Sequence, residues 1–324
     1  MANIIITSYC NLHCPYCFAN TMINTESVKN ISIDQLDRIL KWIGPFNEKV
    51  GLIGGEPTLH PQFAEILKHL EEYSKTAEGN PHFVLFTNGV YLDKFIQIIP
   101  KNMDILVNVN QPQAMSTEQY ARMLINLQTM YKMGWLNTKE TKGRVTIGCN
   151  ICEQIDDYRF IWDIAKRFKI STMRMSVCAP THPEQLADKD GYYEMMKPKF
   201  LRFVDDALKN EVNLSPDCNQ IPACYFTEEE IRKVNASYVD DADCGYPKCE
   251  PVIDITPEFK ASSCFGAYKL IDCDQFNSLN EMERYVHFKV MYPKILNNCG
   301  GKCEGCKLHE LMQCQGGCLA FSKD

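Results

Sequence analysis

The sequence lacks the features that would assign it to three large classes of proteins. No apolar run reaches the roughly 18 residues that a membrane-spanning helix needs, so we expect no membrane partner. The net charge is −7 and no lysine or arginine cluster stands out, which argues against a nucleic-acid partner held by phosphate contacts. The first residues, "ANIIITS", carry no basic segment, so we expect no signal peptide and a cytoplasmic protein.

Cysteine is abundant but unevenly distributed. The chain has 17 cysteines in 324 residues, none between Cys17 and Cys149, and the region from Cys218 to Cys318 holds most of them. A disulfide framework in a secreted protein would be spread more evenly, whereas cytosolic proteins keep cysteines reduced and use dense clusters for metals. The distribution therefore favours metal binding.

Apolar runs rich in β-branched residues alternate with helical patterns over the first two hundred residues. With 45% hydrophobic residues, the chain can bury a sizeable core. Nearly continuous apolar strands are typical of a parallel sheet covered by helices, so we expect an α/β fold with ligands at the carboxyl ends of the strands. The expected strands are residues 3–8, 49–54, 82–87, 104–110, 144–150 and 172–177.

The helices and the domain boundary are also marked in the sequence. Capping-box pairs predict three helix starts, at Ser32 with Gln35, Ser116 with Gln119, and Thr227 with Glu230. A long helix is expected at about 192–209, followed by a possible seventh strand, "EVNLS". Cysteine, proline and glycine then become more frequent. We therefore predict a first domain over 1–213 and a second over 214–324.

Three cysteines follow the first strand in the stretch "CNLHCPYC". The spacing of Cys10, Cys14 and Cys17 could arise by chance. These cysteines could also bind zinc together with a histidine such as His13 or His60. They could also hold a [4Fe–4S] cluster that leaves one iron with an open position. The second strand ends in "GGEP", where glycines permit close approach of a ligand and a glutamate can meet an ammonium group.

Together these segments resemble the radical SAM superfamily. Cys10, Cys14 and Cys17 match its three-cysteine loop, Tyr16 is the aromatic residue of that loop, and Gly54, Gly55 and Glu56 match the motif that holds the amine of S-adenosylmethionine (SAM). The resemblance implies a partial (β/α)6 TIM-like barrel and reductive cleavage of SAM to a 5′-deoxyadenosyl radical that abstracts hydrogen from a substrate. An external reductant such as flavodoxin or ferredoxin would supply the electron.

The same resemblance implies further SAM contacts at later strand ends. Each of these residues could equally be a structural polar group, and no catalytic acid or base can be named. The candidates are Thr87, Asn88, Asn108, Asn110, Asn150, Arg174 and Ser176.

The last third carries cysteines at metal-site spacing. A zinc ribbon with glycine knuckles is one interpretation. The segment also resembles the SPASM or twitch extension, which binds one or two auxiliary [4Fe–4S] clusters. By that pattern one cluster would have Cys244, Cys249, Cys264 and Cys318, and a second would have Cys303, Cys306 and Cys314. No cysteine follows Cys318, so the fourth ligand of the second cluster has to be another residue. Cys299 is one possibility, and Cys218 or Cys224 is another. Alternatively, the second cluster has no fourth ligand, or only one auxiliary cluster exists.

The resemblance implies oxidative modification of a peptide or protein, such as crosslink or thioether formation. Phe265 follows Cys264 where sulfatase-maturing relatives carry an aspartate, which disfavours that chemistry. One alternative is a twitch-type dehydrogenase of a small molecule. Another is a non-catalytic protein that binds SAM or transfers electrons, although neither the three-cysteine loop nor "GGEP" is needed for electron transfer alone.

Overall fold

The structure is a computed structural model. It describes residues 2–17, 19–20, 27–45, 49–78, 81–180, 182–217, 219–239, 249, 252–264 and 269–322. The chain forms two compact units. The first comprises Met1–Asn108, Pro112–Trp135 and Pro251–His287, and the second comprises Val109–Gln111, Leu136–Glu250 and Phe288–Asp324. The domain boundary expected between residues 213 and 214 stays a prediction.

A mostly parallel sheet forms the core of the first unit. Its parallel strands are β1 (Ala2–Thr7), β2 (Lys49–Gly54), β3 (His82–Thr87) and β4 (Met103–Asn108), which stand side by side in sequence order. On the other side of β1, β8 (Ile253–Ile255) pairs in parallel, and β9 (Lys260–Ser262) and β10 (Ile271–Asp272) continue antiparallel. The apolar residues of β1 are fully buried because both faces of the sheet are covered.

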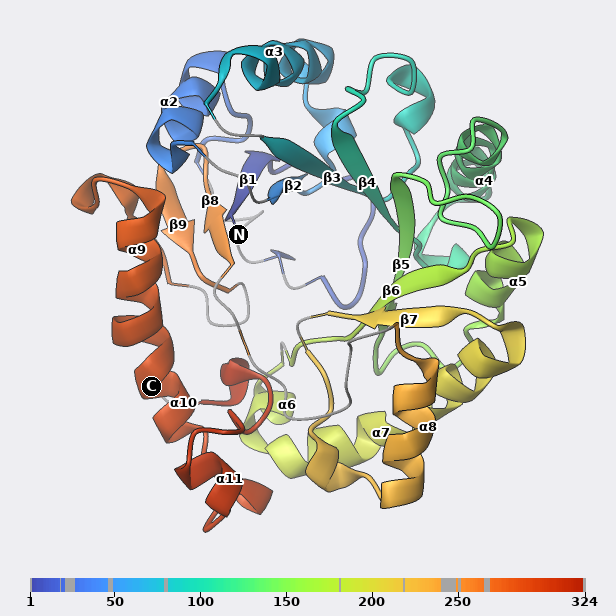
Figure 1. The fold of residues 1–324 in the computed structure, drawn as a ribbon, viewed down its shortest axis with the longest axis vertical. Coiled ribbons are helices and arrows are strands. Elements are labelled where there is room, and N and C mark those ends of the chain that lie inside the picture. The colour runs from blue at the N-terminus through green and yellow to red at the C-terminus, as the bar shows by residue number, and fades with distance from the viewer. Residues whose placement is uncertain are drawn as a thin grey trace. The chain divides into compact units, whose positions relative to one another are not determined.

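Helices cover the outer face of this sheet. Figure 1 shows α2 (Ile33–Ile43) and α3 (Phe63–Thr76) lying outside β1, β2 and β3. The capping boxes expected at Ser32 and Ser116 are both present, and they start α2 and α4 (Thr117–Lys132). The unit also contains α9 (Leu279–Tyr285) and the 3-10 turns η1 (Pro57–Leu59), η2 (Leu92–Lys94), η3 (Pro112–Ala114) and η6 (Cys273–Gln275).

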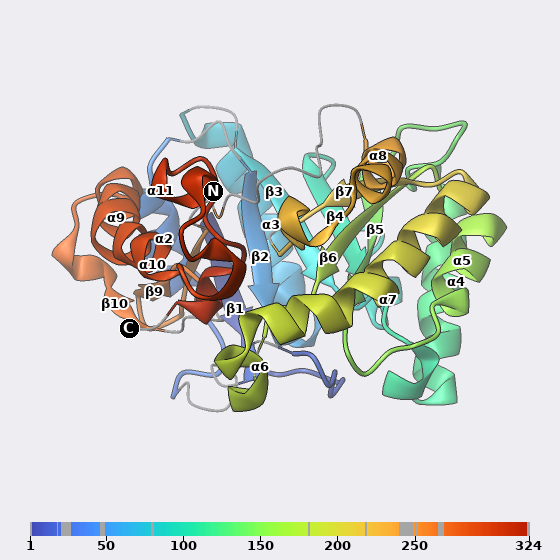
Figure 2. The same ribbon diagram turned by 90° about the horizontal axis from the view of Figure 1, so that it is seen from below.

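The second unit repeats the alternation of strands and helices. Its strands β5 (Val145–Ile151), β6 (Thr172–Val177) and β7 (Asn213–Pro216) pair in parallel. The long helix expected at 192–209 is α7 (Lys189–Asn210), and Figure 2 shows its length. Thr227 caps α8 (Glu228–Ser237) as expected. The remaining elements are α5 (Arg159–Arg167), α6 (Pro183–Ala187), α10 (Tyr292–Asn297), α11 (Lys307–Glu310), η4 (Ala223–Tyr225), η8 (Gly301–Cys303) and η9 (Leu319–Phe321), and a π-helix runs over Val286–Met291.

The expected α/β class and all the expected strands are therefore confirmed. In the first unit the carboxyl ends of β1, β2 and β3 carry Thr7, Gly54 and Thr87 at one edge of the sheet. Within the part of the chain that the structure describes, none of the helices has the length and apolar character needed to cross a membrane.

Candidate cofactor site

The cysteine loop follows β1 and is held by its own backbone. The Cys17 amide donates to the Cys14 carbonyl at 3.0 Å, which closes a turn. All three thiols are partly buried. Burial raises the pKa of the Cys10 thiol, and the nearby charges of Glu56 and Cys17 raise it further. Cys10, Cys17 and Glu56 thus lie close enough together to interact electrostatically.

Metal ligation by this loop stays a prediction. Across the described residues, no three histidine, cysteine, aspartate or glutamate side chains converge as the ligands of a metal ion do. Tyr16, the expected aromatic residue of the loop, is half-buried.

The two glycines after β2 allow the backbone to pass directly against this loop. The Gly55 amide donates to the Thr7 carbonyl at 2.8 Å, and the Glu56 amide donates to the Tyr9 carbonyl at 2.7 Å. A Cβ atom on Gly55 would lie 2.4 Å from the Tyr9 oxygen and 3.0 Å from the Cys10 Cβ, and one on Gly54 would lie 2.3 Å from the Thr7 oxygen. The sequence suggested glycines for close approach of a ligand, and the structure shows that contact between two strand ends already requires them.

Glu56 joins the carboxyl ends of β2 and β3. Its side chain is 1% exposed. Oε1 accepts hydrogen bonds from the Thr58 amide (3.1 Å), the Thr58 hydroxyl (2.6 Å) and the Thr87 hydroxyl (2.7 Å), and Oε2 accepts one from the Asn88 amide (2.7 Å). Thr87 and Asn88, expected as SAM contacts, are therefore also the partners that hold this carboxylate.

The charge of Glu56 has no cationic partner among the described groups that act on it. Burial raises the pKa of this carboxyl, and the hydrogen bonds from Asn88, Thr58 and Thr87 lower it again in part. Since all of these donors are neutral, a ligand ammonium would be the first cation to compensate the buried charge.

Asn11, inside the cysteine loop, is a polar residue that the sequence did not single out. Its Oδ1 accepts from Asn88 Nδ2 at 2.9 Å, and its backbone oxygen accepts from Gln119 Nε2 at 3.2 Å. Its Nδ2 is buried with no hydrogen-bond partner in the described part of the chain. A buried donor without a partner suits an acceptor atom of a cofactor. No sequence pattern marks this residue, because its partners are 77 and 108 positions away.

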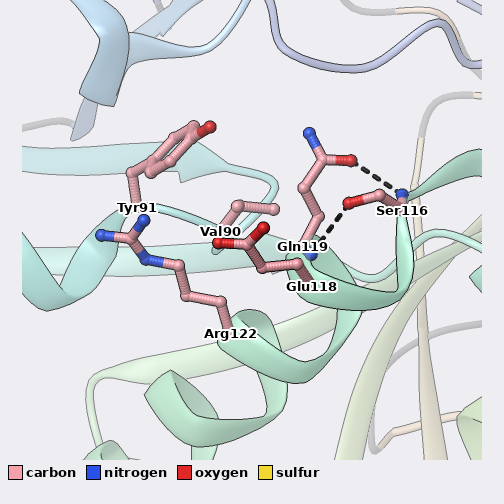
Figure 3. Close-up of a pocket in the computed structure, with 6 residues that line it drawn as sticks. All are labelled: Val90, Tyr91, Ser116, Glu118, Gln119 and Arg122. Atoms are coloured by element: carbon pink, nitrogen blue, oxygen red, sulfur yellow. Dashed lines mark hydrogen bonds between the residues drawn. The ribbon is translucent and has the colours of Figure 1, made fainter.

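A polar pocket of about 250 Å³ lies beyond Gln119 (Figure 3). In that view the Arg122 guanidinium lies next to the Tyr91 side chain, and it is 4.8 Å from the ring centroid. Arg122 also binds Asp93 through two hydrogen bonds of 3.0 and 2.6 Å, so its charge is already paired. The pocket is lined by Val90, Tyr91, Ser116, Glu118, Gln119 and Arg122.

The other expected SAM contacts occupy later strand ends. Asn108 ends β4 in the first unit. In the second unit, Asn110 is 4% exposed and Asn150 lies in β5. Ser176 is buried and donates to the Val177 carbonyl at 3.0 Å. Arg174 forms an ion pair with Asp217, which gives it a structural role within the protein.

Two of the C-terminal cysteines of the second unit, Cys303 and Cys318, contact the first residues of α7. Lys189 Nζ lies 3.3 Å from Cys303 Sγ and 3.1 Å from the Asn298 carbonyl. The Cys306 amide donates to the Cys303 carbonyl at 3.1 Å, and Cys303 and Cys306 both act electrostatically on Cys314. Cys303, Cys306 and Cys314, expected as ligands of one cluster, therefore lie near one another.

The set expected for the other cluster is only partly described. Cys264, in the first unit, accepts at its carbonyl from the Ser262 hydroxyl at 3.1 Å. In the second unit, the Cys249 amide donates to Gln315 and the Cys318 amide to the Tyr193 hydroxyl. Cys299 is exposed. Three positions used in the sequence interpretation lie outside the described residues: Cys218, Cys244 and Phe265.

The chain is similar to known proteins in both sequence and structure. Residues 4–146 match the family model of the radical SAM superfamily. A GTP 3′,8-cyclase of Synechocystis sp. is 26% identical over 179 residues, which cover 52% of this chain and 50% of that protein. The chain thus matches about half the length of this curated relative.

Two solved structures share the fold. Streptococcus suis SuiB bound to S-adenosylmethionine gives a TM-score of 0.62 at 16% identity, covering 98% of this chain and 72% of SuiB. Native anSMEcpe with bound AdoMet and Cp18Cys peptide gives a TM-score of 0.61 at 16% identity, covering 98% and 88% of the two chains. The expected TIM-like α/β fold with a cysteine-rich C-terminal part is thereby confirmed.

Proposed function

We propose that this chain, of which residues 4–146 match the radical SAM superfamily, cleaves S-adenosylmethionine reductively and abstracts hydrogen from a peptide or protein substrate. Cys10, Cys14 and Cys17 would hold a [4Fe–4S] cluster with one open iron, and the bound cluster would supply the electron that cleaves SAM. Flavodoxin or ferredoxin would reduce it. The observation that carries the proposal is the close packing of Gly55 against Cys10, with Glu56 buried next to both.

Each residue at this edge of the sheet has a part in the proposed binding. Glu56 would receive the SAM ammonium, because its buried carboxylate has only neutral donors among the described groups that act on its charge. Thr58, Thr87 and Asn88 fix the orientation of that carboxylate through their hydrogen bonds. Asn11 Nδ2 would donate to an acceptor of the bound cofactor, since it has no other partner in the described chain.

A peptide substrate is supported by the extent of the structural likeness. It covers 98% of this chain, including the cysteine-rich C-terminal residues, for native anSMEcpe with bound AdoMet and Cp18Cys peptide. The auxiliary clusters expected in that region would accept the electron that the substrate radical loses as the oxidised product forms, or would bind a substrate thiolate.

The test uses the reconstituted full chain, reduced with dithionite under anaerobic conditions. Formation of 5′-deoxyadenosine is measured with and without candidate precursor peptides, and peptide products are examined by mass spectrometry for loss of hydrogen. We expect deoxyadenosine in stoichiometry with modified peptide. No deoxyadenosine under any condition would refute the catalytic proposal, and deoxyadenosine without peptide modification would refute the substrate class.

A second candidate substrate is a small molecule. The observation that favours it is the sequence similarity to a GTP 3′,8-cyclase, which covers 52% of this chain. The same assay with GTP in place of peptide separates the candidates, because a nucleotide substrate would stimulate deoxyadenosine formation and a peptide would not.

A further inference from the structure

Three large apolar side chains of the second unit are exposed in one row along a helical segment. Phe288 is 61% exposed, Tyr292 is 43% exposed and Leu296 is 49% exposed. Phe288 belongs to the π-helix, and Tyr292 and Leu296 belong to α10. Residues four positions apart are neighbours on a helix surface, so these three side chains follow one another along the same side. Single exposed apolar side chains are common on protein surfaces, whereas a group of them indicates a surface that another molecule covers.

The row stands on a helix that is fixed from its other side. Ile295 of α10 is 3% exposed, and its carbonyl accepts a hydrogen bond from His309 Nε2 at 3.1 Å. This bond holds α11 beside α10, as Figure 1 shows. Leu311 directly follows α11 and is 67% exposed. Because α10 already buries its other side, it cannot turn the exposed row inward.

The segment that carries the row has charge of one sign. Residues 288–303 contain three lysines and no aspartate or glutamate, although the whole chain has a net charge of −7. Lys289, next to Phe288, is exposed, and Lys302 is paired with Glu194 at 2.7 Å. Apolar side chains combined with positive charge are complementary to an apolar surface that is bordered by acidic groups.

The spacing of the row fits a helix as the partner. Side chains four residues apart form the ridge with which one helix packs into the groove of another. The row from Phe288 to Leu296 is about 12 Å long at the α-helical rise of about 1.5 Å per residue, so a partner helix of about three turns would cover it. A contact of this size is smaller than a stable protein interface, so we expect a weak and reversible complex.

Two other occupants fit this surface less well. Two copies of this chain that paired row against row would bring the lysines of both segments together, with no acid in either segment to compensate them. A helix that lies in a membrane surface buries a broad apolar face in the lipid and is attracted to anionic headgroups. Here α10 buries Ile295 within its own unit, and the chain as a whole is acidic.

We propose that Phe288, Tyr292 and Leu296 form a docking surface for an acidic amphipathic helix of another polypeptide. The surface recognises its partner through the apolar row and through the positive charge of its segment. The proposal goes beyond the proposed function and does not depend on SAM cleavage, so either can fail while the other stands.

The experiment measures binding of a fluorescein-labelled helical peptide to the full chain by fluorescence anisotropy. The peptide has about 18 residues, with leucines along one face and glutamates elsewhere, which is long enough to hold a helix. Leu296→Glu should weaken binding at least about tenfold, because it removes an apolar contact and places an acid opposite the glutamates. The matched control is Ile125→Glu, which puts the same charge at a 64% exposed residue of α4 and should bind like wild type. No binding by wild type, or equal losses in the two variants, would overturn the docking surface.

A charge exchange tests the second part of the recognition. Lys289→Glu changes an exposed side chain, so it should fold like wild type. It should bind the acidic peptide more weakly and a peptide with lysines in place of the glutamates more strongly. If wild type bound both peptides equally, the role of charge would be refuted.

Sedimentation velocity and vesicle binding test the other two occupants. Wild type should stay monomeric at micromolar concentration and should not bind vesicles of phosphatidylcholine and phosphatidylglycerol. Self-association that Leu296→Glu abolishes would assign the surface to a second copy, and vesicle binding that Leu296→Glu abolishes would assign it to a membrane. Either result would overturn the proposal.

Discussion

Asp254, on β8 in the first unit, is a buried acid that we expect to be protonated below neutral pH. It is 5% exposed, and burial raises the pKa of its carboxyl from 3.8 to about 7. Asn3 Nδ2 donates to Asp254 Oδ1 at 2.7 Å, while Asn3 Oδ1 is buried with no hydrogen-bond partner in the described chain. A protonated Asp254 can donate to that oxygen, so that the acid and the amide form two hydrogen bonds with each other.

The effect on stability follows from the two pKa values. Between pH 4 and pH 7 the folded chain holds the Asp254 proton and the unfolded chain does not, so stability decreases as the pH rises through this window. A difference of about three pKa units corresponds to about 4 kcal/mol. Asp254→Asn keeps both hydrogen bonds with Asn3 and does not titrate, so it should match the wild type near pH 4 and exceed its stability by up to about 4 kcal/mol above pH 7.

The assay is urea unfolding of wild type and variant at several pH values under anaerobic conditions. Taking the difference between the two proteins removes the contributions of other titrating groups. The matched control is Asp104→Asn on β4, since hydrogen bonds with Lys49 and His82 outweigh burial and lower the pKa of Asp104. Because the folded pKa of Asp104 lies below 3.8, this variant should lose stability relative to wild type as the pH rises to about 4, which is the opposite sign in a lower pH range. If Asp254→Asn changed stability equally at pH 5 and pH 8, the protonation of Asp254 would be refuted.

Three further predictions concern the edge of the sheet where the cysteine loop lies. Glu56→Gln keeps the size but removes the charge, so SAM should bind about ten- to a hundredfold more weakly in calorimetry. Thr58→Val should have a smaller effect, and equal losses would contradict the role of the charge. Gly55→Ala should lower the free energy of unfolding by about 1–3 kcal/mol, because its Cβ would lie 2.4 Å from a backbone oxygen; Gly300→Ala, with nothing within 4 Å, should unfold like wild type. Cys14→Ala should abolish SAM cleavage while keeping the spectra of the auxiliary clusters, and retained cleavage would exclude this loop as the SAM site.

The strands and helix starts could be predicted because their signals are local. The strands β1 to β4 are short runs rich in apolar residues, and each capping box needs only residues three positions apart, such as Ser32 and Gln35. The motif "GGEP" could be identified for the same reason. Its position against the cysteine loop also follows from general rules, because parallel strands that are neighbours in sequence bring their carboxyl ends to one edge.

The partners of the key polar groups could not be predicted, because they depend on pairing between distant segments. Asn3 and Asp254 are 251 positions apart and meet through the pairing of β1 with β8. The pattern of residues 253–255, "IDI", predicts at most a short strand and gives no indication of its neighbour. The capping box that predicts the start of α4 likewise gives no indication of Asn126, which is buried and donates to the carbonyls of Gly89 and Val90.

Glycine has the same physical role at both groups of cysteines, and this argues that each is a constructed site. At the first, Gly55 brings one strand end to within contact of Cys10. At the second, Gly316 has φ of +74°, and a Cβ atom there would lie 3.1 Å from Cys303 Sγ and 2.7 Å from the Asn298 carbonyl. Any side chain at either position would push apart the groups that surround a cysteine, and the left-handed backbone at Gly316 adds a further cost for other residues. A loop that only connected two elements would not need its backbone this close to a cysteine, so the packing favours the predicted binding role of both groups of cysteines.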